Sequence, residues 1–243
     1  MLIRSCSRSI LFLAALLFGL MASNANAFTI YDTGVLGGNP ESSLIGVTIT
    51  DTDVVGDSFD LDWVVANVVG TEDLSATGNF MLLAFTDDYF DLQVTIANTT
   101  VLSSSLTNAD ILSLGFGVNP DAAAAFLMAG EESAVFDGID EGDGPQQTYP
   151  GGFKGIDVCV YGDGGCNGGA VAEGLHAGDT DSFQIRITGD FSDDMADLLY
   201  FPIKFQTNVG SFEPGALIPE PSAALVFGLG MVAASARMRR TRR

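Results

Sequence analysis

The stretch FDLDWVV, residues 59–65, alternates apolar side chains with mostly acidic ones at a period of two. Successive side chains of an extended strand point to opposite faces, so Phe59, Leu61, Trp63 and Val65 share one face. The pattern predicts a strand with one face in a hydrophobic core. Trp63, the only tryptophan, belongs to that face. The alternative is an exposed aromatic platform on which a sugar ring stacks.

Similar signals recur along the chain. We expect further strands at 44–50, 80–86, 90–96, 111–118, 156–161, 183–187 and 199–205. Asp87-Asp88 predicts a hairpin turn, and Pro202, which cannot donate to a ladder, predicts a sheet edge or a bulge. About eight to ten strands with turn-rich connections indicate an all-β fold, an antiparallel β-sandwich or jelly roll formed as a single domain by residues 28–218.

Residues 121–130 interrupt the strand pattern, because four consecutive alanines, 122–125, favour a helix. Asp121 is well placed to cap its N-terminus and Gly130 to end it. We expect one or two helical turns here.

The N-terminus has the three parts of a secretory signal peptide, residues 1–27. Arg4 and Arg8 precede an apolar run over 10–21, and Ala25 and Ala27 supply small residues at the cleavage position. The pattern predicts export, cleavage by signal peptidase and Phe28 as the first mature residue.

The C-terminus, residues 219–243, also combines three chemistries. Pro219, Glu220 and Pro221 discourage a helix, and an uncharged apolar run follows over 222–236. The stretch ends in a basic cluster, which consists of Arg237, Arg239, Arg240, Arg242 and Arg243. Arginines stay on the cytoplasmic side and stop translocation. Fifteen helical residues reach only about 22 Å, short of a ~30 Å hydrocarbon core, which favours a processing signal over a permanent anchor.

This combination resembles the PEP-CTERM sorting signal of exported proteins in Gram-negative bacteria that make exopolysaccharide. The resemblance implies transient insertion of the transmembrane helix in the inner membrane. It also implies removal of the tail by an exosortase, a membrane cysteine protease and transpeptidase, and a final place at the cell surface or outside the cell. A generic tail anchor is the alternative interpretation.

A second resemblance lies inside the body. The segments Leu114-Gly115-Phe116-Gly117, 156–159 and Cys166-Asn167-Gly168-Gly169 are similar to those of the cistern group of PEP-CTERM proteins. That group shares a glycine-rich cysteine pair late in a β-rich domain. The resemblance implies a fold and no activity.

Removing both terminal signals leaves three basic residues against thirty acidic ones, a net charge of −27. A field of that sign repels nucleic acid and anionic lipid, and it attracts divalent cations. Nucleic acid is therefore excluded as a partner.

Two cysteines remain after Cys6 leaves with the signal peptide. An even number of cysteines in an oxidising compartment predicts a disulfide between Cys159 and Cys166. Six intervening residues without a second His or Cys pair argue against zinc, the alternative.

Acidic residues gather over 131–150, where Asp137, Asp140 and Asp143 are candidate calcium ligands. The spacing departs from the EF-hand template, since position three is Ile139 and position twelve is Thr148. We expect a solvated acidic loop and no cofactor, with a calcium site of another kind as the alternative.

No catalytic motif is present in the sequence. His176 is the only histidine, expected on the surface, and neither a G-x-S-x-G elbow nor an H-E-x-x-H helix occurs. We expect a non-enzymatic structural or interaction protein of the extracellular polysaccharide (biofilm) matrix. The alternative is a calcium-assisted carbohydrate-binding module, and the lesser alternative is a secreted glycan-active enzyme that uses paired carboxylates.

Overall fold

The computed structural model describes residues 28–35, 43–130, 133–141, 149–169 and 171–219. Within these ranges the chain forms thirteen strands and two short 3-10 turns, Pro150–Gly152 and Val171–Glu173. No α-helix occurs in the described ranges, and none of them holds a helix that could span a membrane. The expected signal peptide, 1–27, and the expected helix at 222–236 lie outside the described residues. The predicted all-β class is confirmed.

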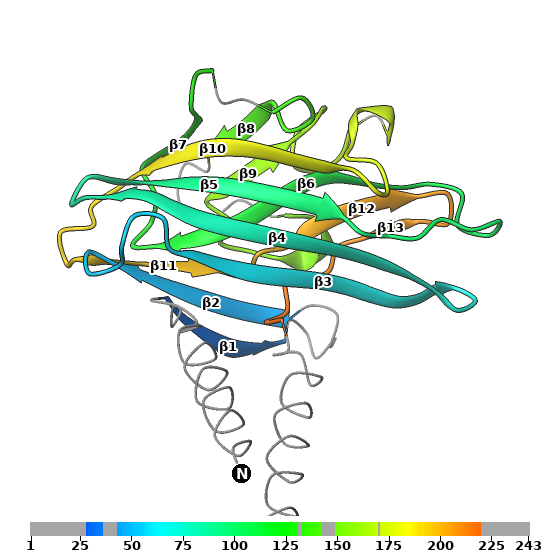
Figure 1. Cartoon of the computed structure of the whole chain (residues 1–243), viewed down its shortest axis with the longest axis horizontal. Coiled ribbons are helices and arrows are strands. Elements are labelled where there is room, and N and C mark those ends of the chain that lie inside the picture. The colour runs from blue at the N-terminus through cyan, green and yellow to red at the C-terminus, as the bar shows by residue number, and fades with distance from the viewer. Residues whose placement is uncertain (1–27, 36–42, 131–132, 142–148, 170, 220–243) are drawn as a thin grey trace, which may run out of the picture.

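The strands form two antiparallel sheets that face each other as a β-sandwich (Figure 1). The larger sheet contains β1 (Thr29–Val35), β2 (Ser43–Thr50), β6 (Ala109–Asn119), β8 (Gly138–Glu141), β9 (Val158–Tyr161), β11 (Met195–Leu199), β12 (Ile203–Thr207) and β13 (Ser211–Phe212). The smaller sheet has the order β3 (Ser58–Val69), β4 (Glu72–Phe85), β5 (Tyr89–Asn98), β10 (Thr180–Thr188) and β7 (Ala124–Leu127). Strands that the sequence pattern did not predict, such as β1, β8 and β13, raise the number of strands above the expected eight to ten.

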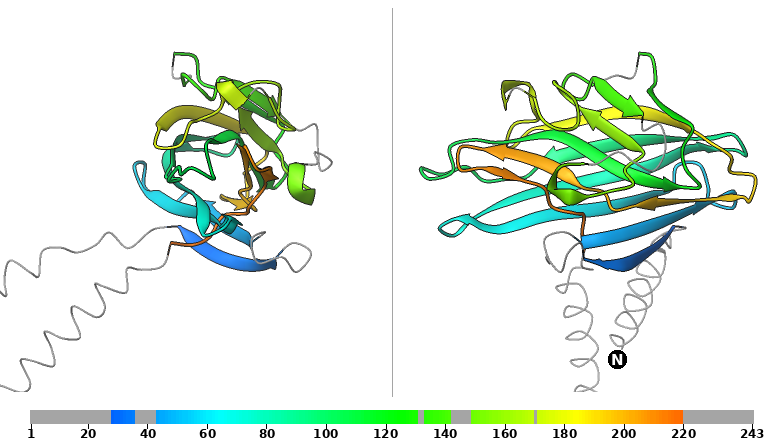
Figure 2. Two further views of the ribbon diagram at one scale, coloured as in Figure 1. Left: turned by 90° about the vertical axis from the view of Figure 1, so that its right-hand side faces the viewer. Right: turned by 180° about the vertical axis from the view of Figure 1, so that it is seen from behind.

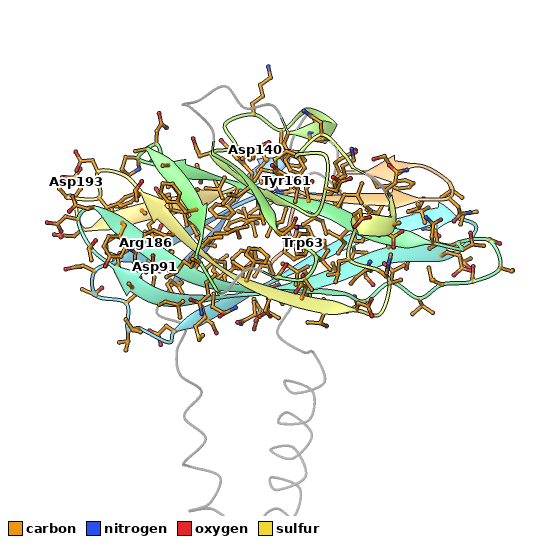
Figure 3. All side chains as sticks on the ribbon, turned by 90° about the horizontal axis from the view of Figure 1, so that it is seen from above. Trp63, Asp91, Asp140, Tyr161, Arg186 and Asp193 are labelled. Atoms are coloured by element: carbon orange, nitrogen blue, oxygen red, sulfur yellow. A yellow bond between two sulfur atoms is a disulfide. The ribbon has the colours of Figure 1, made fainter. Side chains whose placement is uncertain are left out.

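The alternation at the start of β3 is confirmed. Phe59, Leu61, Trp63 and Val65 are each at most 3% exposed and face the core between the sheets. The indole N–H of Trp63 donates to the carbonyl of Phe201 in the opposite sheet at 2.7 Å. Figure 3 shows Trp63 in the interior. The exposed sugar-stacking platform is therefore wrong for this tryptophan.

Asp87 and Asp88 form the turn between β4 and β5, as predicted. The N–H of Thr86 donates to the carbonyl of Tyr89 at 2.8 Å and closes this turn. The strands expected at 44–50, 80–86, 90–96, 111–118 and 183–187 are also present, and β9 occupies the end of 156–161.

The expected strand at 199–205 is divided into β11 and β12, which lie end to end along β6. Leu199 pairs with Gly117 and Ile203 with Leu114, so three residues, 200–202, oppose two on β6. One extra residue on one strand is a β-bulge. The bulge predicted from Pro202 is therefore present, and its Phe201 carbonyl is the one that Trp63 binds.

The short helix expected at 121–130 is wrong, because residues 124–127 form strand β7. Backbone hydrogen bonds join Ala123 N–H to Thr188 carbonyl at 2.7 Å and Met128 N–H to Gln184 carbonyl at 2.9 Å. The free edge of β10 thus satisfies this backbone, and Ala125 is buried in the core. Tertiary pairing outweighs the helix propensity of alanine, which is only a few tenths of a kcal/mol per residue, about 0.7 at most.

Strand β6 is buried on both faces, apart from its last residue. Its inner face contacts the core between the two sheets. A second apolar cluster, formed mainly by the 149–166 segment, covers its outer face. The cluster consists of Tyr149, Phe153, Ile156, Cys159 and Cys166, with Leu44, Tyr161 and Tyr200 at its border. In Figure 2 this yellow-green segment lies along the larger sheet, to which its strand β9 belongs.

Both ends of the described body lie against β3. Phe28 packs edge to face on Phe59, with ring centroids 5.4 Å apart. At the other end, residues 214–217, which we call the strap, cross from β12 to β3, where Leu217 forms an antiparallel bridge with Asp62. The two ends therefore lie on the same side of the sandwich, near β1 (Figure 1).

Candidate functional site

A shallow cleft of about 440 Å³ lies at one end of the sandwich, between the β5–β6 connection and the segment before β10. Its walls are mainly apolar and include Leu102, Ala109, Ala172 and Ala177. Polar groups enter it from Thr107, Asn108, Asp110 and His176. We call it the loop-end cleft. Pockets of this volume with a few converging polar groups are the usual form of small-ligand sites.

The only histidine and a buried carboxylate meet in the loop-end cleft. Nδ1 of His176 and Oδ1 of Asp110 are 2.6 Å apart. The His176 side chain is 56% exposed, whereas that of Asp110 is 6% exposed. The hydrogen bond to the Asp110 carboxylate, with the negative charge of that group, raises the pKa of His176 above its ordinary value. His176 is a surface residue, as expected, but Asp110 holds its ring in place.

Asn98, at the end of β5, holds the walls of the cleft together. Its buried side-chain amide donates to the carbonyls of Ala109 at 2.8 Å and Leu175 at 2.9 Å. Its backbone accepts the N–H of Gly178 at 2.8 Å. Because one residue joins β5, the start of β6 and the 175–178 segment, the position of His176 follows from the sheet.

The Asp110–His176 pair supplies two of the groups that a hydrolase triad combines. A carboxylate on Nδ1 leaves Nε2 of the ring to accept or donate a proton, as in hydrolase triads. In the described part of the chain, however, the His176 side chain bonds to Asp110 alone, and no hydroxyl or thiol is hydrogen-bonded to Nε2. The pair can orient the 174–179 segment and bind a polar group of a ligand.

Asp137 and Asp140, the two candidate calcium ligands within the described residues, do not line the loop-end cleft. Asp140, on β8, lies beside Tyr161 of β9 (Figure 3), and burial together with the Asp140 charge raises the pKa of Tyr161. Asp143 lies outside the described residues. Among the residues that are described, no three His, Cys, Asp or Glu side chains are grouped to hold a metal ion.

The predicted disulfide is confirmed. Cys159 on β9 and Cys166 are bonded, with their Cα atoms 6.1 Å apart. The loop that they close, 160–165, is followed by Asn167, whose carbonyl accepts a hydrogen bond from the ammonium group of Lys204 on β12. The bond thus pins a loop and supplies two buried sulfur atoms to the second apolar cluster.

The residues of the predicted processing signals are almost all outside the described ranges. Pro219 is the last described residue. Outside lie Ala25, Ala27, Glu220, Pro221, Arg237, Arg239, Arg240, Arg242 and Arg243.

Sequence reasoning missed Asn98 and Asp110, which organise the cleft, and the ion pair of Arg186 with Asp91. Arg186 lies beside Asp91 (Figure 3) and makes two hydrogen bonds to it, both 2.7 Å. The Arg186 guanidinium also lies over the ring of Tyr89, 3.9 Å from its centroid. The sequence gives no signal for Asp91 or Asp110, because acidic residues are common along this chain. Their partners, Arg186 and His176, lie 95 and 66 residues away, so no local spacing indicates the pairs.

No protein-family model, curated protein or solved structure matches this chain.

Proposed function

We propose that this chain is an exported, exosortase-sorted protein of the cell surface or extracellular matrix, associated with exopolysaccharide and without catalytic activity. Signal peptidase would remove residues 1–27, and the tail from Pro219 would be inserted transiently in the inner membrane of a Gram-negative bacterium before an exosortase removes it. The role of the body is structural, through interactions of its surface.

The observation that carries this proposal is the position of the two junctions. Phe28 packs on Phe59 and Leu217 bridges to Asp62, so both junctions lie three residues apart on one strand. A precursor with both ends in the same membrane needs its junctions on one side of the folded body. This arrangement meets that need without unfolding any strand.

The surface of the body also supports a solvated extracellular role. Of its basic residues, Arg186 pairs with Asp91 and Lys204 is buried, which leaves Lys154 exposed among thirty acids. A surface of one sign keeps the protein soluble and separated from anionic membranes once it is released. The disulfide suits an oxidising compartment.

The mass and the location of the protein in its native bacterium test the proposal. Three chains are compared: the full chain, a chain that ends at Ile218, and a full-length variant with Pro219→Ala, Glu220→Gln and Pro221→Ala. We expect the full chain to lose both ends and reach the surface, and the triple variant to keep its tail and stay in the inner membrane. Equal mass and equal location of the full chain and the triple variant would refute the proposal.

The loop-end cleft favours a second candidate, a carbohydrate-binding module. Its volume is sufficient for one sugar ring, and Asp110, His176 and Asn108 offer hydrogen-bond partners for hydroxyl groups. Calcium would act elsewhere, on the acidic loops. Binding to a glycan array, compared between the native protein and His176→Ala with and without EDTA, tests this candidate. Identical weak binding by both proteins would refute it.

A further inference from the structure

The strap has one attachment to each sheet. The carbonyl of Pro214 accepts the N–H of Ile203 on β12 at 3.1 Å. Three residues later, Leu217 exchanges two backbone hydrogen bonds with Asp62 of β3, at 2.6 and 3.0 Å. Between these attachments Ala216 is fully buried. The strap therefore closes one side of the sandwich with the last residues before the Pro-Glu-Pro motif.

This attachment limits how far the motif can extend from the body. Pro219 is two residues beyond Leu217, a reach of about 7 Å at full extension. Ser222, where the apolar run begins, is five residues beyond Leu217, a reach of about 17 Å. While the bridge is closed, the chain beyond Leu217 therefore cannot carry the start of the apolar run more than about 17 Å from the edge of β3.

A peptidase in the membrane needs an extended stretch of substrate on both sides of the bond that it cuts, because such sites bind peptides as extended strands. The closed strap leaves only Ile218 between the bridge and the motif. We propose that the strap is a latch that withholds the motif from the membrane peptidase until the bridge between Asp62 and Leu217 opens. This inference rests on the proposed function.

The bridge is suited to opening without loss of the fold. It is an isolated pair on β3, the edge strand of the smaller sheet. Leu217 and Ile218 are 36% and 43% exposed, whereas Ala216 is buried and stays as the inner anchor. Two backbone hydrogen bonds at an exposed edge favour the closed state over the open one by about tenfold to a hundredfold. The folded body thus sets the rate at which the tail is processed.

Three chains that differ at or directly after the strap test the inference in the native bacterium. The first is the natural chain, and the second carries six Gly and Ser residues inserted between Ile218 and Pro219. The third carries Asp62→Cys and Leu217→Cys, since residues that exchange both backbone bonds have Cα atoms about 5.5 Å apart, within disulfide range. The control is Asp62→Ser with Leu217→Ser, which keeps the backbone bonds without the lock.

The half-time for conversion of precursor to mature protein is measured by pulse labelling. We expect conversion about tenfold faster with the insertion, at least tenfold slower with the oxidised cysteine pair, and close to natural in the serine control. Equal half-times for the natural, extended and locked chains, with the lock verified by mass, would overturn the latch alone. A natural chain that is never converted would overturn the proposed function, and the latch with it.

Discussion

Replacement of Trp63 by Phe tests whether the indole joins the two sheets. The change removes the N–H that bonds to the Phe201 carbonyl at 2.7 Å and leaves that carbonyl buried without a partner. An unsatisfied buried group costs about 1–3 kcal/mol. The smaller ring also leaves a cavity and loses buried apolar surface, which adds about 1–2 kcal/mol. We therefore expect the free energy of unfolding to fall by about 3 kcal/mol.

For a body of this size, a loss of about 3 kcal/mol lowers the melting temperature by about 6–12 °C. The assay is urea unfolding of the mature body followed by far-UV circular dichroism, because the variant has no tryptophan to report fluorescence. The matched control is Val64→Thr, next to Trp63 on the same strand but 40% exposed. It should change stability by no more than about 0.5 kcal/mol.

A loss below about 1 kcal/mol for Trp63→Phe, with an unchanged slope against urea, would refute the reasoning. A complementary variant is Gly78→Ala, because a Cβ on Gly78 would lie 2.7 Å from the buried indole. Overpacking of this kind costs about 1–3 kcal/mol. If Gly78→Ala were neutral, the indole could not occupy the position that the hydrogen bond to Phe201 requires.

The remaining predictions concern the disulfide and two ionisable groups. Replacement of both Cys159 and Cys166 by Ser should lower the free energy of unfolding by about 2.5 kcal/mol, measured in urea against the oxidised native protein. Reductant should lower the stability of the native protein by a similar amount, and no loss in the double variant would contradict the prediction. His176 should titrate above its ordinary pKa in an NMR experiment, since Asp110 favours its charged form, and Asp110→Asn should lower that pKa. The stability that this pair contributes is full below the unfolded pKa of about 6.5 and is lost as the pH rises through the folded value; a flat profile around neutrality would argue against the pair. Burial raises the pKa of the Asp157 carboxyl, so the folded state is favoured below about pH 3.8 and loses this contribution as the pH rises through the folded pKa; Asp157→Asn should remove that part of the pH dependence of unfolding, and an unchanged profile would contradict the assignment.

The sequence by itself was sufficient for features that depend on neighbouring residues or on composition. Alternation at Phe59 to Val65 requires only that one face of a strand be buried, and the structure confirms it. The turn at Asp87-Asp88 and the bulge at Pro202 depend on the backbone preferences of those residues alone, so both could be predicted from the sequence. The disulfide was predicted from the number of cysteines and from the oxidising compartment that the terminal signals imply, and the structure confirms the bond. The processing signals stay predictions.

Only the tertiary structure decided the features that depend on distant partners. Residues 124–127 form a strand because β10 offers a free edge, although their alanines favour a helix. Strand β6 is buried on both faces because the 149–166 segment folds over it, and Asp110 meets His176 across 66 residues of chain. The strap reaches β3 through a bridge between residues 62 and 217. Periodicity records which face of an element is buried, but the strand that covers this face is selected by packing of the whole chain, which no local pattern encodes.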